Sequence, residues 1–431
     1  MKLFLYIFVI FIINQRSFSQ KINGSENVKE LMSEYRYGEA LALADSLAGQ
    51  NSSNTELLYL KARSLYEMKR FQEAINTLNF ALKFQSADIK IIMDLITNYK
   101  NVGEKDSTIY FGNQLIQLYP GNIYFKYQLA DLYIQYDNYG AAINILLPVY
   151  LADTANFYNI MQVANCYYQL EMLDEANTLY RKAIKLIPFE KNAVSRLANI
   201  SIKKKKYNEG IIITNQFLEK DSDNTSILKL NAYLYYLSGY YDTAVVKFNK
   251  CILLNEKSRF TKKYLALSYY KNQDYFIAEP LFREVYESDT TETEICFYLG
   301  VSANRSEDID TSLVYLNKTL DKLTPPGSYL SLIYSELADA NNKLHRNDTA
   351  LVLFKKALEA SPDNHSLLFK IAYQYDFYLK RPFDAYKYYK KYVQNTSRPV
   401  SNETDETLSM SYFDYAINRI NQLEPYSKKK K

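Results

Sequence analysis

Histidine and cysteine, which often carry nucleophilic, proton-transfer or metal chemistry, are scarce in this chain. Its 431 residues contain two histidines, His345 and His365, and three cysteines, Cys166, Cys251 and Cys296. Neither histidine belongs to a metal or nucleophile motif, and the chain has no GxGxxG, P-loop, GxSxG or HExxH motif. The odd, widely spaced cysteines indicate no disulfide framework and fall on apolar helical positions. We therefore predict no catalytic residue, no metal site, no cofactor and no enzyme activity.

Tyrosine is the residue type whose chemistry remains to be explained. The chain has 43 Tyr and no Trp, and five tyrosines fall within "YLYYLSGYYDTA", Tyr233 to Ala244. A tyrosine offers a large contact area at a low side-chain entropy cost, with a hydroxyl for hydrogen bonding. The same side chain also packs between helices, so its position in the fold must separate recognition from packing.

A small residue recurs every 34 residues along most of the chain. We call this repeat position 20, and after the ninth member two more follow at intervals of 38 and 35: Ala40, Ala74, Thr108, Ala142, Ala176, Gly210, Ala244, Ala278, Ser312, Ala350 and Ala385. Position 8, about twelve residues earlier, is also small in most units, with Ile96 as an exception, and position 11 is often Tyr. A fixed period of this length indicates an array of similar units.

Within each unit the apolar residues follow helical spacing. Positions 4, 7, 8 and 11 form one face and positions 20, 24, 27 and 28 another, which predicts two amphipathic helices joined by a turn near position 15. Small residues at positions 8 and 20 allow the two backbones to approach closely. Asp, Ser or Thr near positions 18 and 19, as in Asp242-Thr243, is expected to cap the second helix. Since no unit buries its apolar face alone, neighbouring units must stack.

This pattern resembles the tetratricopeptide repeat (TPR) family over residues from about 21 to 398, most clearly at 157–190 and 331–364. The resemblance implies an all-α fold, a right-handed superhelical solenoid of about 11 helix-turn-helix repeats. Extra residues around "TPPGS" (324–328) predict a division into an array of about nine repeats at 21–323 and two further repeats at 329–398. The remaining 399–431 is expected to hold a linker, a C-terminal capping helix within 405–425, and a basic tail.

The resemblance also implies a concave groove, lined by positions 2, 5, 6, 9, 12 and 13 of the first helices, that binds peptides or proteins. The candidate groove residues in this register are Tyr127, Asn165, Tyr168, Arg196, Asn199, Lys229, Tyr233, Tyr236, Lys263, Tyr264, Tyr270 and Phe297. Their Arg and Lys side chains suit a carboxylate, and their Asn side chains suit a peptide backbone. About half of the groove tyrosines are expected to be mainly structural. The carboxylate clamp of chaperone-binding members is missing, because Asn165 follows Met161 and Asn199 follows Ser195 instead of Lys.

The five clustered tyrosines separate in this register. Tyr235 and Tyr241, at positions 11 and 17, are predicted to pack in the core, and Tyr240 to lie in the turn. Tyr233 and Tyr236, at positions 9 and 12, are predicted to face the groove.

The first residues are typical of a signal peptide. Lys2 precedes an apolar run of 11 residues at 3–13, too short for the roughly 20 that span a bilayer, and Ser17 and Ser19 suit cleavage after Ser19. Removing residues 1–19 lowers the net charge from +4 to +2, which favours no nucleic-acid partner.

We therefore expect a periplasmic or secreted bacterial protein. The leading hypothesis is a non-enzymatic scaffold of the cell envelope that binds a peptide or partner protein along its groove, near a membrane only through an envelope complex. The alternative is a carbohydrate-binding protein in polysaccharide uptake or wall maintenance, because tyrosine faces stack on sugars.

Overall fold

The computed structural model describes residues 24–322, 327–396 and 406–427, and over these residues the chain is all-α, without strands. The predicted signal peptide (1–19), the predicted linker and the predicted basic tail (428–431) lie outside the described residues. Internal contacts divide the chain into two units, residues 1–193 and 194–431, and each is described by itself.

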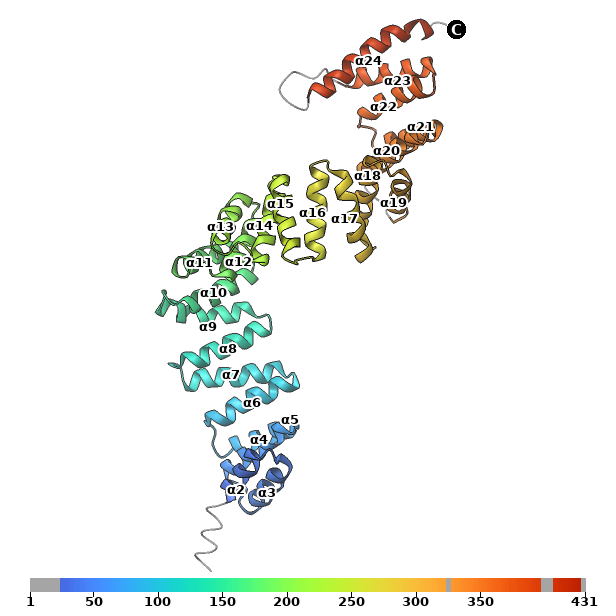
Figure 1. Cartoon of the computed structure of the whole chain (residues 1–431). Helices are drawn as coiled ribbons and strands as arrows, with labels where there is room; N and C mark the ends of the chain where they lie inside the picture. The colour runs from blue at the N-terminus through green and yellow to red at the C-terminus, as the bar shows by residue number, and fades with distance from the viewer. Residues whose placement is uncertain (1–23, 323–326, 397–405, 428–431) are drawn as a thin grey trace, which may run out of the picture. The chain divides into compact units, whose positions relative to one another are not determined.

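In the first unit, first and second helices of successive repeats alternate along the chain (Figure 1). They are α2 (Gly24–Ser33), α3 (Tyr37–Gln50), α4 (Thr55–Glu67), α5 (Phe71–Leu82), α6 (Ile89–Val102), α7 (Lys105–Leu118), α8 (Ile123–Gln135), α9 (Tyr139–Ala152), α10 (Phe157–Gln169) and α11 (Leu173–Leu186).

The second unit continues the alternation and contains most of α12, whose first residues belong to the first unit. Its helices are α12 (Lys191–Lys203), α13 (Tyr207–Lys220), α14 (Thr225–Leu237), α15 (Tyr241–Leu253), α16 (Arg259–Lys271), α17 (Tyr275–Ser288), α18 (Thr293–Arg305), α19 (Ile309–Lys322), α20 (Gly327–Lys343), α21 (Asn347–Ala360), α22 (Ser366–Tyr373), the π-helix η1 (Gln374–Tyr378), α23 (Pro382–Asn395) and α24 (Glu406–Ser427).

The turn between the two helices of each repeat lies where the sequence predicts it. Position 15 is left-handed throughout: Tyr35, Lys69, Gly103, Asp137, Glu171, Lys205, Gly239, Gln273, Glu307, His345 and Lys380 all have positive φ. In the second repeat the backbone N–H of Arg70 donates to the Leu65 carbonyl at 2.9 Å, and that of Lys69 donates to Tyr66 at 2.8 Å. These bonds satisfy carbonyls at the end of the first helix, so this turn closes as a Schellman motif.

The small residues at positions 8 and 20 pack at the close contact between the two helices. Ala232 and Ala244 are both 0% exposed and share one core cluster with Phe248. At Gly300, which replaces Ala at position 8, an added Cβ would lie 2.9 Å from Cγ of Leu316 and 3.1 Å from its backbone nitrogen. The prediction that these positions set the helix spacing is confirmed, as are the helix pairs themselves.

The predicted caps of the second helices are wrong by two positions. Helix α15 begins at Tyr241, so Tyr240 is its N-cap and provides no side-chain hydrogen bond, while Asp242 lies in the first turn. A carboxylate there interacts favourably with the helix dipole instead. Side-chain caps occur mainly on first helices, where Asn54 accepts from the Leu57 N–H at 3.2 Å and Asn224 from the Ile227 N–H at 3.3 Å. Among second helices, α9 has such a cap, since Asn138 accepts from the Ala141 N–H at 3.1 Å.

A hydrogen bond recurs between a second helix and the first helix of the next repeat. An Asn at position 25 donates its side-chain amide to the hydroxyl of the Tyr twenty residues later, at position 11. The pairs are Asn79 with Tyr99 (3.0 Å), Asn113 with Tyr133 (3.2 Å), Asn215 with Tyr235 (3.0 Å) and Asn249 with Tyr269 (2.9 Å). The prediction that position 11 is a packing position is confirmed, and its hydroxyls also join adjacent repeats.

All three cysteines are buried and free, as predicted. Burial raises the pKa of the Cys166 thiol and of the Cys251 thiol to about 11. Both therefore stay protonated at neutral pH and pack as small apolar side chains.

The predicted capping helix is present as α24, which packs against α23 (Figure 1). Phe413, Ala416 and Leu423 are buried from its side of the contact. Arg419 forms an ion pair with Asp376 of η1, with nitrogen and oxygen 2.6 Å apart. The helix therefore covers the apolar face that the last repeat would otherwise expose.

Candidate functional site

In the second unit the first helices of neighbouring repeats contact one another, α14 with α16 and α18 with α20. Four aromatic side chains gather on α14 and α16, and we call them the tyrosine ridge: Tyr233, Tyr236, Phe260 and Tyr264. The Tyr264 ring lies at their centre, with centroid distances of 4.5 Å to Tyr233, 5.2 Å to Tyr236 and 4.6 Å to Phe260. The structure thus brings three of the predicted groove residues together and adds Phe260.

The tyrosine ridge is half-buried and electrically neutral. Phe260 is 38% exposed, and its three tyrosine neighbours are partly exposed. Burial raises the pKa of Tyr233 and of Tyr236 above the ordinary phenol value, so both keep their protons. The Tyr264 hydroxyl donates to the Tyr233 hydroxyl over 3.4 Å, a long and weak bond that leaves both groups able to bind a ligand.

Aromatic contacts continue onto α18. Tyr270 packs edge-on against Tyr298 with ring centroids 4.9 Å apart, and burial raises the pKa of Tyr270 to about 12. Tyr236, Tyr264, Tyr270 and Tyr298 all pack on one buried cluster. Tyr270 is therefore partly structural, as expected for half of the predicted tyrosines.

Phe297 corrects the predicted set. It is only 4% exposed and shares a core cluster with Leu316 and Ile333. Its ring lies 5.0 Å from the Tyr329 ring, contributed by the first residues of α20. Because neighbouring side chains cover it, Phe297 is a core residue.

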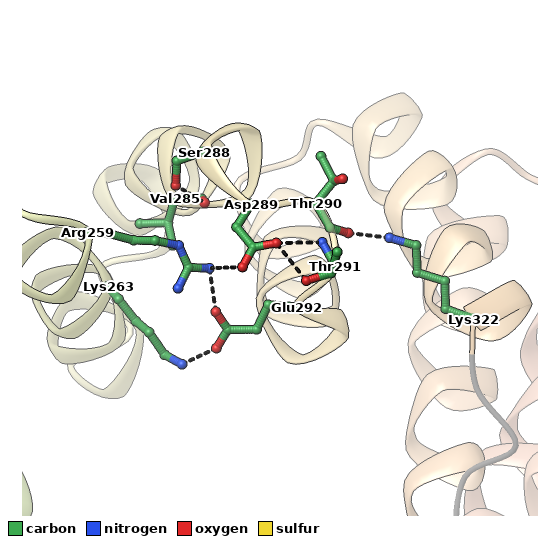
Figure 2. A network of polar contacts seen from close by, with 9 residues as sticks. All are labelled: Arg259, Lys263, Val285, Ser288, Asp289, Thr290, Thr291, Glu292 and Lys322. Carbon is green, nitrogen blue, oxygen red and sulfur yellow. Dashed lines mark hydrogen bonds and ion pairs between the residues drawn. The ribbon is translucent and has the colours of Figure 1, made fainter. Parts of the chain in front are cut away.

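The predicted groove lysines are already paired within the chain. Lys229 Nζ lies 3.4 Å from Glu256 Oε1, and Lys263 pairs with Glu292 (Figure 2). Arg259 also binds Glu292, and its guanidinium lies 4.0 Å from Asp289. A partner carboxylate would have to displace these contacts, which weakens the case for carboxylate capture.

The loop between α17 and α18 holds Glu292 in place (Figure 2). Asp289 accepts from the Thr291 N–H at 2.9 Å and from its hydroxyl at 2.6 Å, and Lys322 donates to the Thr290 carbonyl. Burial acts to raise the pKa of Glu292, but hydrogen bonds from Lys263 and Arg259 outweigh it and lower the pKa overall. Glu292 is thus a fixed carboxylate that ties α16 to the next repeat.

The first-unit candidates make contacts within that unit. The Tyr127 hydroxyl donates to Asn159, and its ring meets Tyr158 edge-on at 5.1 Å. Asn165 accepts from the Tyr180 hydroxyl at 2.7 Å, and the Tyr168 ring lies 6.5 Å from that of Tyr180. All three candidates are partly exposed, and their role in binding stays a prediction.

Arg196 and Asn199 lie on α12 and are also partly exposed. Their assignment to a groove stays a prediction.

Sequence reasoning missed three features of this region. Phe260 is at position 2, one of the groove positions, but was not among the candidates. Glu256 and Glu292 lie in the loops that precede first helices α16 and α18. The signal for them in the sequence was a carboxylate 27 or 29 residues after each groove lysine. The Asn–Tyr pairs carried an equally simple signal, a constant spacing of twenty residues.

Comparison with known families agrees with this geometry. A family model described as Tetratricopeptide repeat matches residues 31–89, and another with the same description matches residues 159–190. The chain is a tetratricopeptide repeat protein. The second match coincides with the TPR pair α10–α11, one of the two segments in which the sequence pattern is clearest.

Relatives of this TPR protein are distant. A TPR repeat-containing protein of Methanocaldococcus jannaschii is 22% identical over 298 residues, covering 57% of this chain and 52% of that protein. The chain therefore spans about half the length of this curated relative. Among solved structures, YrrB, "a TPR protein with an unusual peptide-binding site", is 18% identical with a TM-score of 0.40, covering 44% of this chain and 96% of its own. The C-terminal part of a TPR repeat-containing protein from Cytophaga hutchinsonii is 18% identical with a TM-score of 0.44, covering 56% and 97%.

The described part of this TPR protein holds no cluster of three or more His, Cys, Asp or Glu side chains arranged for a metal ion. None of its described helices combines the length and apolar character that crossing a membrane requires.

Proposed function

We propose that this TPR protein is a non-enzymatic scaffold of the bacterial cell envelope, which binds a peptide or a partner protein on its tyrosine ridge. The main support for this proposal is one partly exposed aromatic surface on two adjacent first helices, formed by Tyr233, Tyr236, Phe260 and Tyr264. TPR proteins as a class are interaction scaffolds, which supports the general part of the proposal.

The chemistry of the ridge suits a neutral, amphipathic segment. Aromatic rings provide contact area that costs little side-chain entropy, and the Tyr233 and Tyr264 hydroxyls provide donors and acceptors for a peptide backbone. The neighbouring lysines are engaged with Glu256 and Glu292, so binding by the ridge is expected to depend only weakly on salt.

Location in the envelope rests on the signal-peptide pattern of residues 1–19 alone. The test is N-terminal sequencing of the protein recovered from periplasm and medium. The proposal expects a mature chain that begins at Gln20, and a cytoplasmic chain with an uncut N-terminus would refute this part.

The ridge is tested by chemical crosslinking and pull-down from envelope extracts with the full chain. Tyr233→Ala and Phe260→Ala each remove one ridge ring, and Phe276→Ala is the control, because Phe276 is 81% exposed on second helix α17. The proposal expects a partner that is recovered by the wild type and the control and is several-fold depleted with either ridge variant. Equal recovery by all four proteins, at equal urea midpoints, would exclude the ridge as the binding surface.

A further inference from the structure

A pocket of about 470 Å³ lies in the second unit among α20, α21, α22, η1, α23 and α24, away from the residues of the tyrosine ridge. One wall is aromatic. Tyr412 and Tyr415 of α24 stand over Phe369 with ring centroids 4.8 and 5.9 Å away, and Tyr373 stacks near-parallel to Phe369 at 6.3 Å. Tyr412 and Tyr415 are 45% and 40% exposed, so their rings are accessible at the rim.

A second part of the lining, which we call the polar wall, carries no net charge. Lys370 donates to Asp339 at 2.9 Å and to the Ser335 hydroxyl at 3.0 Å. In the same wall, Asn342 and Gln374 exchange side-chain amide hydrogen bonds of 2.8 and 2.7 Å. Donors and acceptors therefore lie side by side, with the ammonium and the carboxylate cancelling each other.

The backbone is specialised at this pocket. Helix α22 passes into the π-helix η1 at Gln374, whose side chain is 1% exposed and also donates to the Asn347 carbonyl at 2.9 Å. Short π-helical segments are rare and occur frequently at functional sites. Asp376 of η1 holds Arg419 of α24, which fixes the helix that carries the two rim tyrosines.

We propose that this pocket binds a neutral oligosaccharide. A sugar ring has a flat C–H face that packs on an aromatic face and a periphery of hydroxyls that both donate and accept. Phe369, Tyr373 and Tyr412 supply the rings, and the Lys370–Asp339 pair supplies a donor and an acceptor within reach of adjacent hydroxyls. Aromatic walls with a few placed polar groups are typical of small-ligand pockets, and the volume accommodates one or two sugar rings.

The ion pair in the pocket favours a neutral ligand over a charged one. A free anion would meet Asp339, and a free cation would meet Lys370, so a charged ligand would have to break the ion pair at the cost of leaving one charge unpaired. An aromatic peptide side chain would fill the ring wall but would offer no hydroxyls to the spare donor and acceptor capacity of Lys370 and Asp339. This site extends the proposed function and is independent of partner binding at the tyrosine ridge.

The test is isothermal titration of the full chain with five neutral hexasaccharides: cellohexaose, laminarihexaose, mannohexaose, xylohexaose and hexa-N-acetylchitohexaose. Two variants probe the two walls: Tyr412→Ala removes an exposed rim ring, and Asp339→Asn keeps the shape while removing the acceptor charge. Tyr426→Ala is the matched control, since Tyr426 is 50% exposed on the same helix and does not line the pocket.

The proposal expects at least one of these sugars to bind, with affinity lowered roughly fivefold or more by Tyr412→Ala, lowered by Asp339→Asn, and unchanged by Tyr426→Ala. Failure of all five sugars to bind the folded wild type overturns it, as does equal affinity for wild type and both pocket variants. Binding of a peptide library member that depends on Tyr412, without sugar binding, would replace it with a peptide site.

Discussion

Replacing Tyr269 by Phe is expected to loosen the contact between two repeats without disturbing the tyrosine ridge. The hydroxyl of Tyr269 accepts the Asn249 amide at 2.9 Å across the interface of α15 and α16. A net intramolecular hydrogen bond is worth about 1 kcal/mol, and Asn249 is only partly exposed, so its donor is poorly compensated by water. The stability of a repeat array is approximately the sum of the stabilities of its repeats and of the interfaces between them. We therefore expect Tyr269→Phe to lower the free energy of unfolding by about 1 kcal/mol.

A double-mutant cycle isolates this bond. Urea unfolding followed by far-ultraviolet circular dichroism is measured for wild type, Tyr269→Phe, Asn249→Ala and the double variant. The expected coupling energy is about 1 kcal/mol. Tyr264→Phe, on the same helix, is the control and should change stability little, because among the described residues its hydroxyl makes only the 3.4 Å contact with Tyr233. A coupling near zero, or an equal loss in the control, would refute the role given to position 11.

The remaining predictions concern the core and the titrating groups. Ala232→Leu should lower the free energy of unfolding by about 1–3 kcal/mol or more, since overpacking strains a site that is 0% exposed, and urea midpoints measure it. All three buried cysteines should resist a thiol reagent in the native protein and react on unfolding, which a colorimetric thiol assay measures. Burial raises the pKa of Tyr233 and Tyr236, so their contribution to stability is intact below about pH 10 and is lost as pH rises beyond it. Urea midpoints measured against pH should therefore fall less steeply in Tyr233→Phe, and an unchanged slope would contradict this.

Much of the fold was predictable because one steric demand recurs in most units. Two helices that meet at positions 8 and 20 require small side chains there, and Ala62, Ala74, Ala232 and Ala244 are all at most 1% exposed. The caps were harder to place, because position 15 takes a left-handed conformation with Gly at only Gly103 and Gly239. Because most of these turns contain no Gly, the sequence does not mark where they end. The positions of Asp and Thr alone therefore do not give the first residue of each second helix.

The candidate site was predicted only in part. The repeat register predicts which face of a first helix a residue lies on, but it does not predict which other side chains cover that residue. Lys263 lies at a groove position, yet its ammonium forms an ion pair with Glu292 of the loop between α17 and α18. Phe297 also has a groove position, but α20 starts at Gly327, ahead of the regular register, and places Tyr329 over its ring. The irregular spacing around TPPGS was visible in the sequence, whereas its effect on Phe297 required the structure.

Site-specific photo-crosslinking in envelope extracts shows directly whether the tyrosine ridge is the surface that contacts the partner. A photoreactive phenylalanine analogue is placed at Phe260 of the ridge or at Phe276 of the control surface, both of which are exposed. If the ridge binds the partner, we expect a discrete adduct from position 260 that is absent from position 276. The same adducts from both positions, or none from position 260, would contradict it.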